Sequence, residues 1–118
     1  MAIAYTSTKD RAKVWHTDDP SYTGEDLEGV IACSEHPAPD GATVFEIRPL
    51  NAAERTRALM QSDPAAAVKA ACVGIEGADD KTRDAILDGL PVNITLDLYR
   101  AVVAVTDGPF PLHGLPSS

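Results

Sequence analysis

Apolar and polar side chains alternate most regularly between residues 42 and 50, where Thr43, Phe45 and Ile47 would share one face of an extended chain. Alternation with a period of two is the pattern of a half-buried β-strand. A turn signal at residues 39–41 comes directly before this run, and Pro49 removes a backbone donor at its end. We therefore predict a strand over residues 42–48 that ends at Pro49 or lies at the edge of a sheet.

After residue 51 the period lengthens from two to about 3.6, which predicts three to four helices. Asn51 and Glu54 have the spacing of a capping box, which favours a helix start at residue 52. Gly74 is expected to end the second helix in a left-handed conformation, and Gly89 to end the third. The helices are predicted over residues 52–61, 64–73, 81–88 and 92–106.

The expected core draws on the strand and on all of the helices. The first helix is expected to turn Leu59 inwards and Arg57 towards water. The last helix is apolar over much of its circumference, because Leu96 broadens the stripe that contains Leu98. Such a helix is usually buried on more than one side, in its own core or against a partner. The residues expected in the core are Phe45, Ile47, Leu59, Val68, Cys72, Ile86, Leu90, Leu98 and Val102.

The two ends of the chain differ in composition from its centre. Residues 1–41 contain three prolines and only short apolar groups, of which residues 14–15 and 27–32 are candidates for short strands. Residues 107–118 contain three prolines and two glycines. We predict an α+β fold, with a small antiparallel sheet or strand region followed by three to four helices. The compact domain is expected over residues 42–106, with an irregular extended N-terminal arm over 1–41 and a Pro/Gly-rich tail over 107–118.

Charge and composition argue against several classes of partner. The 118 residues include 10 Lys and Arg against 18 Asp and Glu, a net charge of -8. Nucleic acids and anionic membranes attract basic stripes, so neither is expected to bind. Neither a signal peptide nor an apolar run of about 20 residues is recognised, which favours synthesis in the cytosol. In that reducing compartment Cys33 and Cys72 are expected to be free thiols.

Residues able to carry catalysis are few and scattered. His16, His36 and His113 lie far apart, outside any helical metal motif or glycine-rich nucleophile turn. Cys33 and His36 have the spacing of zinc ligands, but no second pair of ligands matches them. Neither a calcium-binding loop nor a phosphate-binding glycine motif is found. We therefore expect a protein that is not an enzyme and has neither cofactor nor metal.

Three segments give the chain a resemblance to a known class of proteins. They are residues 44–54, with Arg48-Pro49-Leu50 between strand and helix, residues 70–77, which end in a Gly-hydrophobic-Glu-Gly turn, and residues 87–91. Together they resemble small accessory proteins of tailed bacteriophages, which include tail assembly chaperones and minor virion components. The resemblance spans residues 42–106 and implies protein assembly on a capsid or tail, without cofactor or catalytic residues.

The leading hypothesis is a non-enzymatic bacteriophage virion structural or assembly accessory protein that binds neighbouring capsid or tail subunits. Its expected partners are other virion or assembly proteins, or further copies of itself, and its expected location is the virion or the host cytoplasm during assembly. One alternative is a transient tail assembly chaperone that is absent from the mature virion. The other is a small metal- or thiol-dependent enzyme that uses Cys33 and His36.

Partner contacts are expected in the two arms, because aromatic side chains often anchor interfaces. Trp15 is the strongest candidate, with the alternative that it folds back on the helices of its own chain. The residues expected to contact partners are Tyr5, Trp15, Tyr22, Ile31, Phe110 and Leu112.

Overall fold

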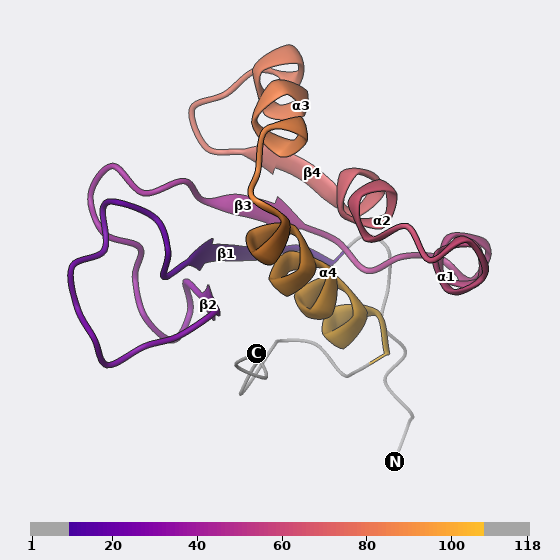
Figure 1. The fold of residues 1–118 in the computed structure, drawn as a ribbon, viewed down its shortest axis with the longest axis horizontal. Helices are drawn as coiled ribbons and strands as arrows, with labels where there is room; N and C mark the ends of the chain where they lie inside the picture. The colour runs from indigo at the N-terminus through magenta and orange to yellow at the C-terminus, as the bar shows by residue number, and fades with distance from the viewer. Residues whose placement is uncertain (1–9, 108–118) are drawn as a thin grey trace.

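Residues 10–107, the part of the chain that the computed structural model describes, form a four-stranded antiparallel sheet and four helices (Figure 1). This arrangement is the α+β class predicted from the sequence. The strands are β1 (Ala12–His16), β2 (Val30–Ala32), β3 (Phe45–Ile47) and β4 (Cys72–Ile75). The helices are α1 (Ala52–Gln61), α2 (Pro64–Ala71), α3 (Asp80–Asp88) and α4 (Val92–Asp107).

The segment predicted to be an irregular arm supplies half of the sheet. The strand order is β2-β1-β3-β4, so β1 lies inside the sheet and pairs with strands on both sides. Val14 is opposite Ala32 of β2 and opposite Phe45 of β3. The described part of residues 1–41 therefore belongs to the domain, and the boundary predicted at residue 41 is wrong there. Strands of three to five residues are too short for their alternation to stand out, and their pairing is non-local.

The two faces of the sheet are covered differently. Val14 and Ile47 lie in one buried cluster with Leu98 and Val102 of α4, which crosses over the sheet (Figure 1). Trp15 alternates to the opposite face, where loops take the place of helices. Its ring lies 5.3 Å from that of Tyr22, measured between centroids, and its Nε1–H donates to the carbonyl of His36 at 2.9 Å. The core therefore has a helical side and a loop side.

Asp19 joins the two loops that cover this second face. Its carboxylate accepts from the backbone N–H of Ser21 at 2.9 Å and from that of Thr43 at 2.8 Å. Partial burial raises the pKa of the Asp19 carboxyl, but the hydrogen bonds from Thr43 and Ser21 together outweigh it and leave the pKa below its ordinary value. The loop after β1 is thereby fixed to the segment that leads into β3.

Most of the predicted core is buried, with one clear error. Phe45, Ile47, Val68, Cys72, Leu98 and Val102 are buried, and Ile86 and Leu90 pack partly buried against them. Leu59 is instead 61% exposed. Helix α1 turns only Ala58 into the core, because the interactions at its N-terminus set its rotation.

Helix α2 is shorter than predicted, because the residues that follow it form β4. Ile75 pairs with Phe45, and Cys72 pairs with Ile47. Gly74 lies inside the strand opposite Glu46, whereas the positive φ of 78° belongs to Gly77 in the following turn. The apolar spacing fits a helix locally, but pairing with the edge of β3 provides hydrogen bonds that a longer helix would forgo.

We predict that Trp15→Ala lowers the free energy of unfolding by about 3–5 kcal/mol, because Trp15 is 1% exposed and its removal leaves a large cavity. Urea denaturation of the full chain measures this change. Leu59→Ala, at an exposed position, is the control and is expected to change stability by no more than about 0.5 kcal/mol. Equal stability of the two variants would contradict the placement of Trp15 in the core.

Candidate functional site

Helix α1 is held mainly by polar interactions at its N-terminus. The side chain of Asn51 accepts from the N–H of Glu54 at 2.8 Å, and the Glu54 carboxylate accepts from the N–H of Asn51 at 3.0 Å. The guanidinium of Arg48 donates to both oxygens of the same carboxylate, each at 2.9 Å. Arg48 holds the pKa of the Glu54 carboxyl below its ordinary value. The capping box predicted from the sequence is confirmed, and the ion pair ties it to the end of β3.

The same helix buries little apolar surface. Ala58 is its only buried residue, whereas Leu59 and Met60 are 61% and 82% exposed. Helices in proteins usually draw their stability from packing an apolar face against the core. In α1, by contrast, Leu59 and Met60 remain exposed to water. The capping box and the Arg48–Glu54 ion pair hold the helix in place. We call five exposed residues of this helix, Ala53, Thr56, Arg57, Leu59 and Met60, the α1 surface.

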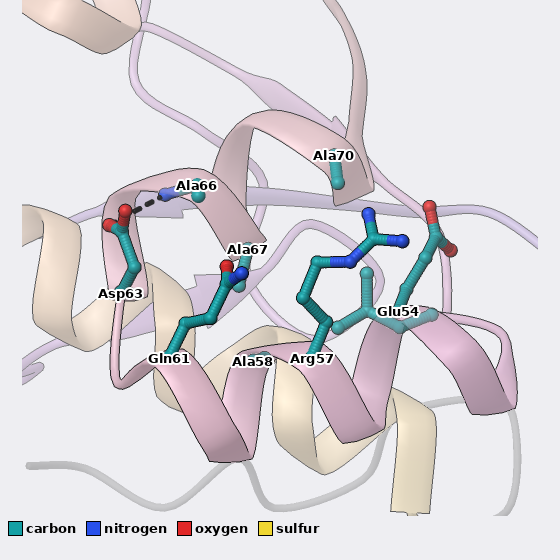
Figure 2. A pocket seen from close by; sticks show the side chains of 9 residues that line it. Glu54, Arg57, Ala58, Gln61, Asp63, Ala66, Ala67 and Ala70 are labelled. Atoms are coloured by element: carbon teal, nitrogen blue, oxygen red, sulfur yellow. Dashed lines mark hydrogen bonds between the residues drawn. The ribbon is translucent and has the colours of Figure 1, made fainter.

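A small pocket lies beside the α1 surface, between α1 and α2 (Figure 2). Its volume is about 100 Å³, and alanines make up much of its wall, since their short side chains do not fill the space between the helices. Arg57 and Gln61 rise from α1 towards α2 at its rim. A pocket of this size and lining suits one apolar side chain of a partner. The apolar wall consists of Leu50, Ala58, Ala66, Ala67 and Ala70.

A second cluster of polar residues joins β1 to α4. His16 is 4% exposed; its Nδ1 accepts from the backbone N–H of Asp18 at 2.9 Å, and its Nε2 lies 2.8 Å from the Asp97 carboxylate. Because Nδ1 accepts, the ring proton is assigned to Nε2, which donates to Asp97. Both ring nitrogens are therefore engaged within the protein. A catalytic His–Asp pair needs one nitrogen directed at the substrate, so this pair acts as a tie between strand and helix.

A hollow of about 350 Å³ opens beside this tie. Asp18 and Glu28 contribute acidic groups to its wall, and Asn93 donates to Asp18 at 2.8 Å. Leu96 lines this hollow and is 39% exposed, and Val92, one helical turn earlier on α4, is 75% exposed. We call the set of Asp18, Glu28, Val92 and Leu96 the α4 surface.

Cys33 and His36 do not form an organised catalytic pair. Partial burial, and then the nearby Glu76 carboxylate, raise the pKa of the Cys33 thiol. A nucleophilic cysteine requires the opposite shift, because the thiolate is the reactive form. The His36 residue is exposed, and among residues 10–107 no group of three His, Cys, Asp or Glu side chains could hold a metal ion.

The partner-binding residues predicted from the sequence are mostly not on an open surface. Trp15 packs within its own domain, as one of the two alternatives had it, although against loops and not against helices. Tyr22 and Ile31 are half-buried around it. Trp15 is therefore corrected from an interface anchor to a core residue, because β1 is an inner strand of the sheet. Tyr5, Phe110 and Leu112 lie outside the described residues.

The exposure of Leu59 and Met60 on α1 was not predicted from the sequence, whereas the broad apolar stripe of α4, which includes Leu96, was. The signal available for α1 was its composition: Leu59 and Met60 are the only large apolar residues in a helix that otherwise contains alanine and polar residues. From the sequence pattern alone, such a narrow apolar pair is equally compatible with burial in the core and with contact to a partner. Only the rotation of the helix distinguishes the two.

Comparison of the chain with protein-family models, curated proteins and solved structures found no match. Within the described residues, no helix combines the length and the apolar character needed to cross a membrane.

Removing the carboxylate of Asp97 is expected to destabilise the fold by about 1–3 kcal/mol, because the buried Nε2–H of His16 loses its acceptor. Asp97→Ala makes this change, and Asp97→Asn, which keeps one oxygen acceptor, is expected to cost less. Urea denaturation of both variants measures the difference. An Asp97→Ala variant as stable as the wild type would contradict the proposed tie.

The Arg48–Glu54 pair predicts a pH-dependent contribution to stability. The pKa of Glu54 is lower in the folded chain than its ordinary value of 4.5, so its contribution is present above pH 4.5 and is lost as pH falls through the folded pKa. Glu54→Gln, which preserves the capping spacing, is expected to cost about 1 kcal/mol at pH 7 and progressively less below pH 4.5.

Denaturation midpoints between pH 7 and pH 3 measure this difference. Glu25→Gln, at an exposed loop position, controls for the loss of one negative charge. A Glu54→Gln effect that stays constant across the pH range would contradict the ionic contribution.

Proposed function

We propose that this chain is a non-enzymatic binding module that docks a neighbouring protein subunit through its α1 surface. The observation that carries the proposal is the exposure of Leu59 and Met60 on a helix whose position is set by polar caps and the Arg48–Glu54 pair. The apolar pair makes little contribution to the chain's own core. Burial of these two side chains against a partner supplies a favourable free energy that folding alone leaves unused.

The form of the α1 surface also supports docking. The helix is ordered before binding, so a partner need not bear the entropic cost of forming it. Met60 has an unbranched, polarizable side chain that adapts to different apolar surfaces. The alanine-lined pocket beside it accepts one side chain from the partner in return. An exposed helix with a small adjoining pocket matches the helix-in-groove mode of recognition.

The resemblance of residues 42–106 to accessory proteins of tailed bacteriophages indicates the class of partner. On this proposal the chain acts on a capsid or tail, in the virion or in the host cytoplasm during assembly. A transient tail assembly chaperone is the rival within the same class. Mass spectrometry of purified particles distinguishes them, because a structural subunit remains in the particle and a chaperone does not.

The paired substitution Leu59→Gln with Met60→Gln is expected to reduce incorporation into particles at least tenfold, since a central apolar contact contributes about 2 kcal/mol or more. Glutamine has a helix propensity close to that of leucine and methionine, so the melting temperature should change little. The matched control exchanges the residues, Leu59→Met with Met60→Leu, and keeps the apolar surface. Incorporation is measured by quantitative mass spectrometry of particles assembled with each variant.

Normal incorporation of the glutamine variant, with the same fold as the wild type, would contradict docking through the α1 surface. If the wild type is absent from mature particles, the same variants are compared in complexes isolated during assembly, where a chaperone is present. Genes of metabolic function around the coding sequence would argue for the enzyme alternative and against the phage assignment.

A further inference from the structure

We infer that the partner of the α1 surface is a second copy of this chain, and that the contact is head to tail, with the α1 surface of one copy on the α4 surface of the next. The inference rests on the proposed function and adds the identity of the partner. It follows from the way exposed apolar side chains, charges and shape are distributed over the molecule.

The exposed large apolar residues within residues 10–107 form two pairs on two different helices. Leu59 and Met60 are consecutive on α1, and Val92 and Leu96 are one turn apart on α4. Scattered single apolar residues on a surface require no explanation, but a pair on each of two helices forms two small patches. Contact between the two patches of neighbouring copies would bury the exposed apolar side chains of both.

The charges beside the two patches are opposite in sign. Arg57 lies next to Met60 on the α1 surface, and both line the same shallow hollow of α1. Asp18 and Glu28 lie next to Leu96 in the wall of the α4 hollow. Arg100 lines the same hollow, but it is paired with Asp97 at 3.2 Å, so Asp18 and Glu28 leave the wall acidic. A chain with a net charge of -8 repels its own copies over most approaches. Contact between a cationic and an acidic patch is the approach that offsets this repulsion, which favours this pairing over α1 against α1.

The two patches also differ in their place on the domain and in their form. Helix α1 projects at one end of the longest axis of the domain, whereas α4 begins near the middle of the view (Figure 1). The α4 surface contains a hollow of about 350 Å³, whereas the α1 surface has a shallower hollow that Arg57 and Met60 line. Because the two patches are unlike, their contact is heterologous and repeats from copy to copy. Such contacts produce rings when the rotation closes and filaments when it does not.

Two variants of the full chain test this geometry. The first, Leu59→Gln with Met60→Gln, disables the α1 surface, and the second, Val92→Gln with Leu96→Gln, disables the α4 surface. Sedimentation velocity over a range of concentrations is expected to show oligomers larger than a dimer for the wild type and monomers for each variant alone. An equimolar mixture is expected to form a 1:1 dimer and nothing larger, because only one competent pair of surfaces remains. Circular dichroism of each variant confirms its fold.

Each other outcome overturns the inference. A monomeric wild type, or variants that associate like the wild type, would show that these surfaces do not join copies. Association of the α4 variant alone would indicate an α1-to-α1 contact. A mixture that stays monomeric would show that the two surfaces do not recognise each other. If the wild type is monomeric while the α1 variant still fails to enter particles, the proposed function stands with a different subunit as partner.

Charge reversal provides a second measurement that does not depend on the apolar variants folding. Arg57→Glu and Glu28→Arg, made separately, are each expected to weaken association roughly tenfold. The two reversals in one chain restore opposite charges across the contact and are expected to recover most of the affinity. No recovery in the double variant would overturn the pairing of the α1 and α4 surfaces.

Discussion

The pairing of β1 with both β2 and β3 is the interaction on which the rest of the fold depends. Val14 faces the helical side of the sheet and Trp15 faces the loop side, so a single strand joins the two halves of the core. His16, the last residue of the strand, holds Asp97 of α4. Without β1, α4 would lose the hydrogen bond between His16 and Asp97 and part of the apolar surface on which it packs. The loops on the other face would lose the Trp15 ring that they cover.

The packing on the helical side of the sheet explains why α1 keeps its large apolar side chains at the surface. Helices α2 and α4 pack against each other and complete the helical side of the core, so α1 is left to contribute one buried alanine. Its position depends instead on Arg48, which follows β3 and binds Glu54. Both charged side chains are only about one-fifth exposed, so this pair is screened less by water than an ordinary surface ion pair. Polar interactions thus fix the helix while its large apolar side chains stay at the surface.

The parts of the structure that depend on local chemistry were predictable from the sequence, whereas those that depend on long-range pairing were not. The cap at Asn51, the end of α3 at Gly89 and the α+β class follow from signals within a few residues. Strands β1 and β2 overlap the candidate strands at residues 14–15 and 27–32, but their place in the sheet depends on pairing partners, and β4 lies partly in a segment predicted to be a helix. Because the pairing of β1 was not recognised, Trp15 was predicted at an interface, whereas it lies in the core. Leu59 was predicted in the core but lies on the surface. The rotation of a helix with a narrow apolar stripe is set by its contacts and not by its composition.

The two surfaces inferred to meet between copies are tied to neighbouring strands of one sheet. Arg48 links α1 to the end of β3, and His16 links α4 to the end of β1. Strands β1 and β3 are adjacent and antiparallel, and α2 packs against both α1 and α4, so the sheet and α2 together set the angle between the α1 and α4 surfaces. In a head-to-tail assembly that angle determines the rotation from one copy to the next. The register between Val14 and Phe45 therefore contributes, with the packing of α2, to whether successive copies would close into a ring or continue as a filament.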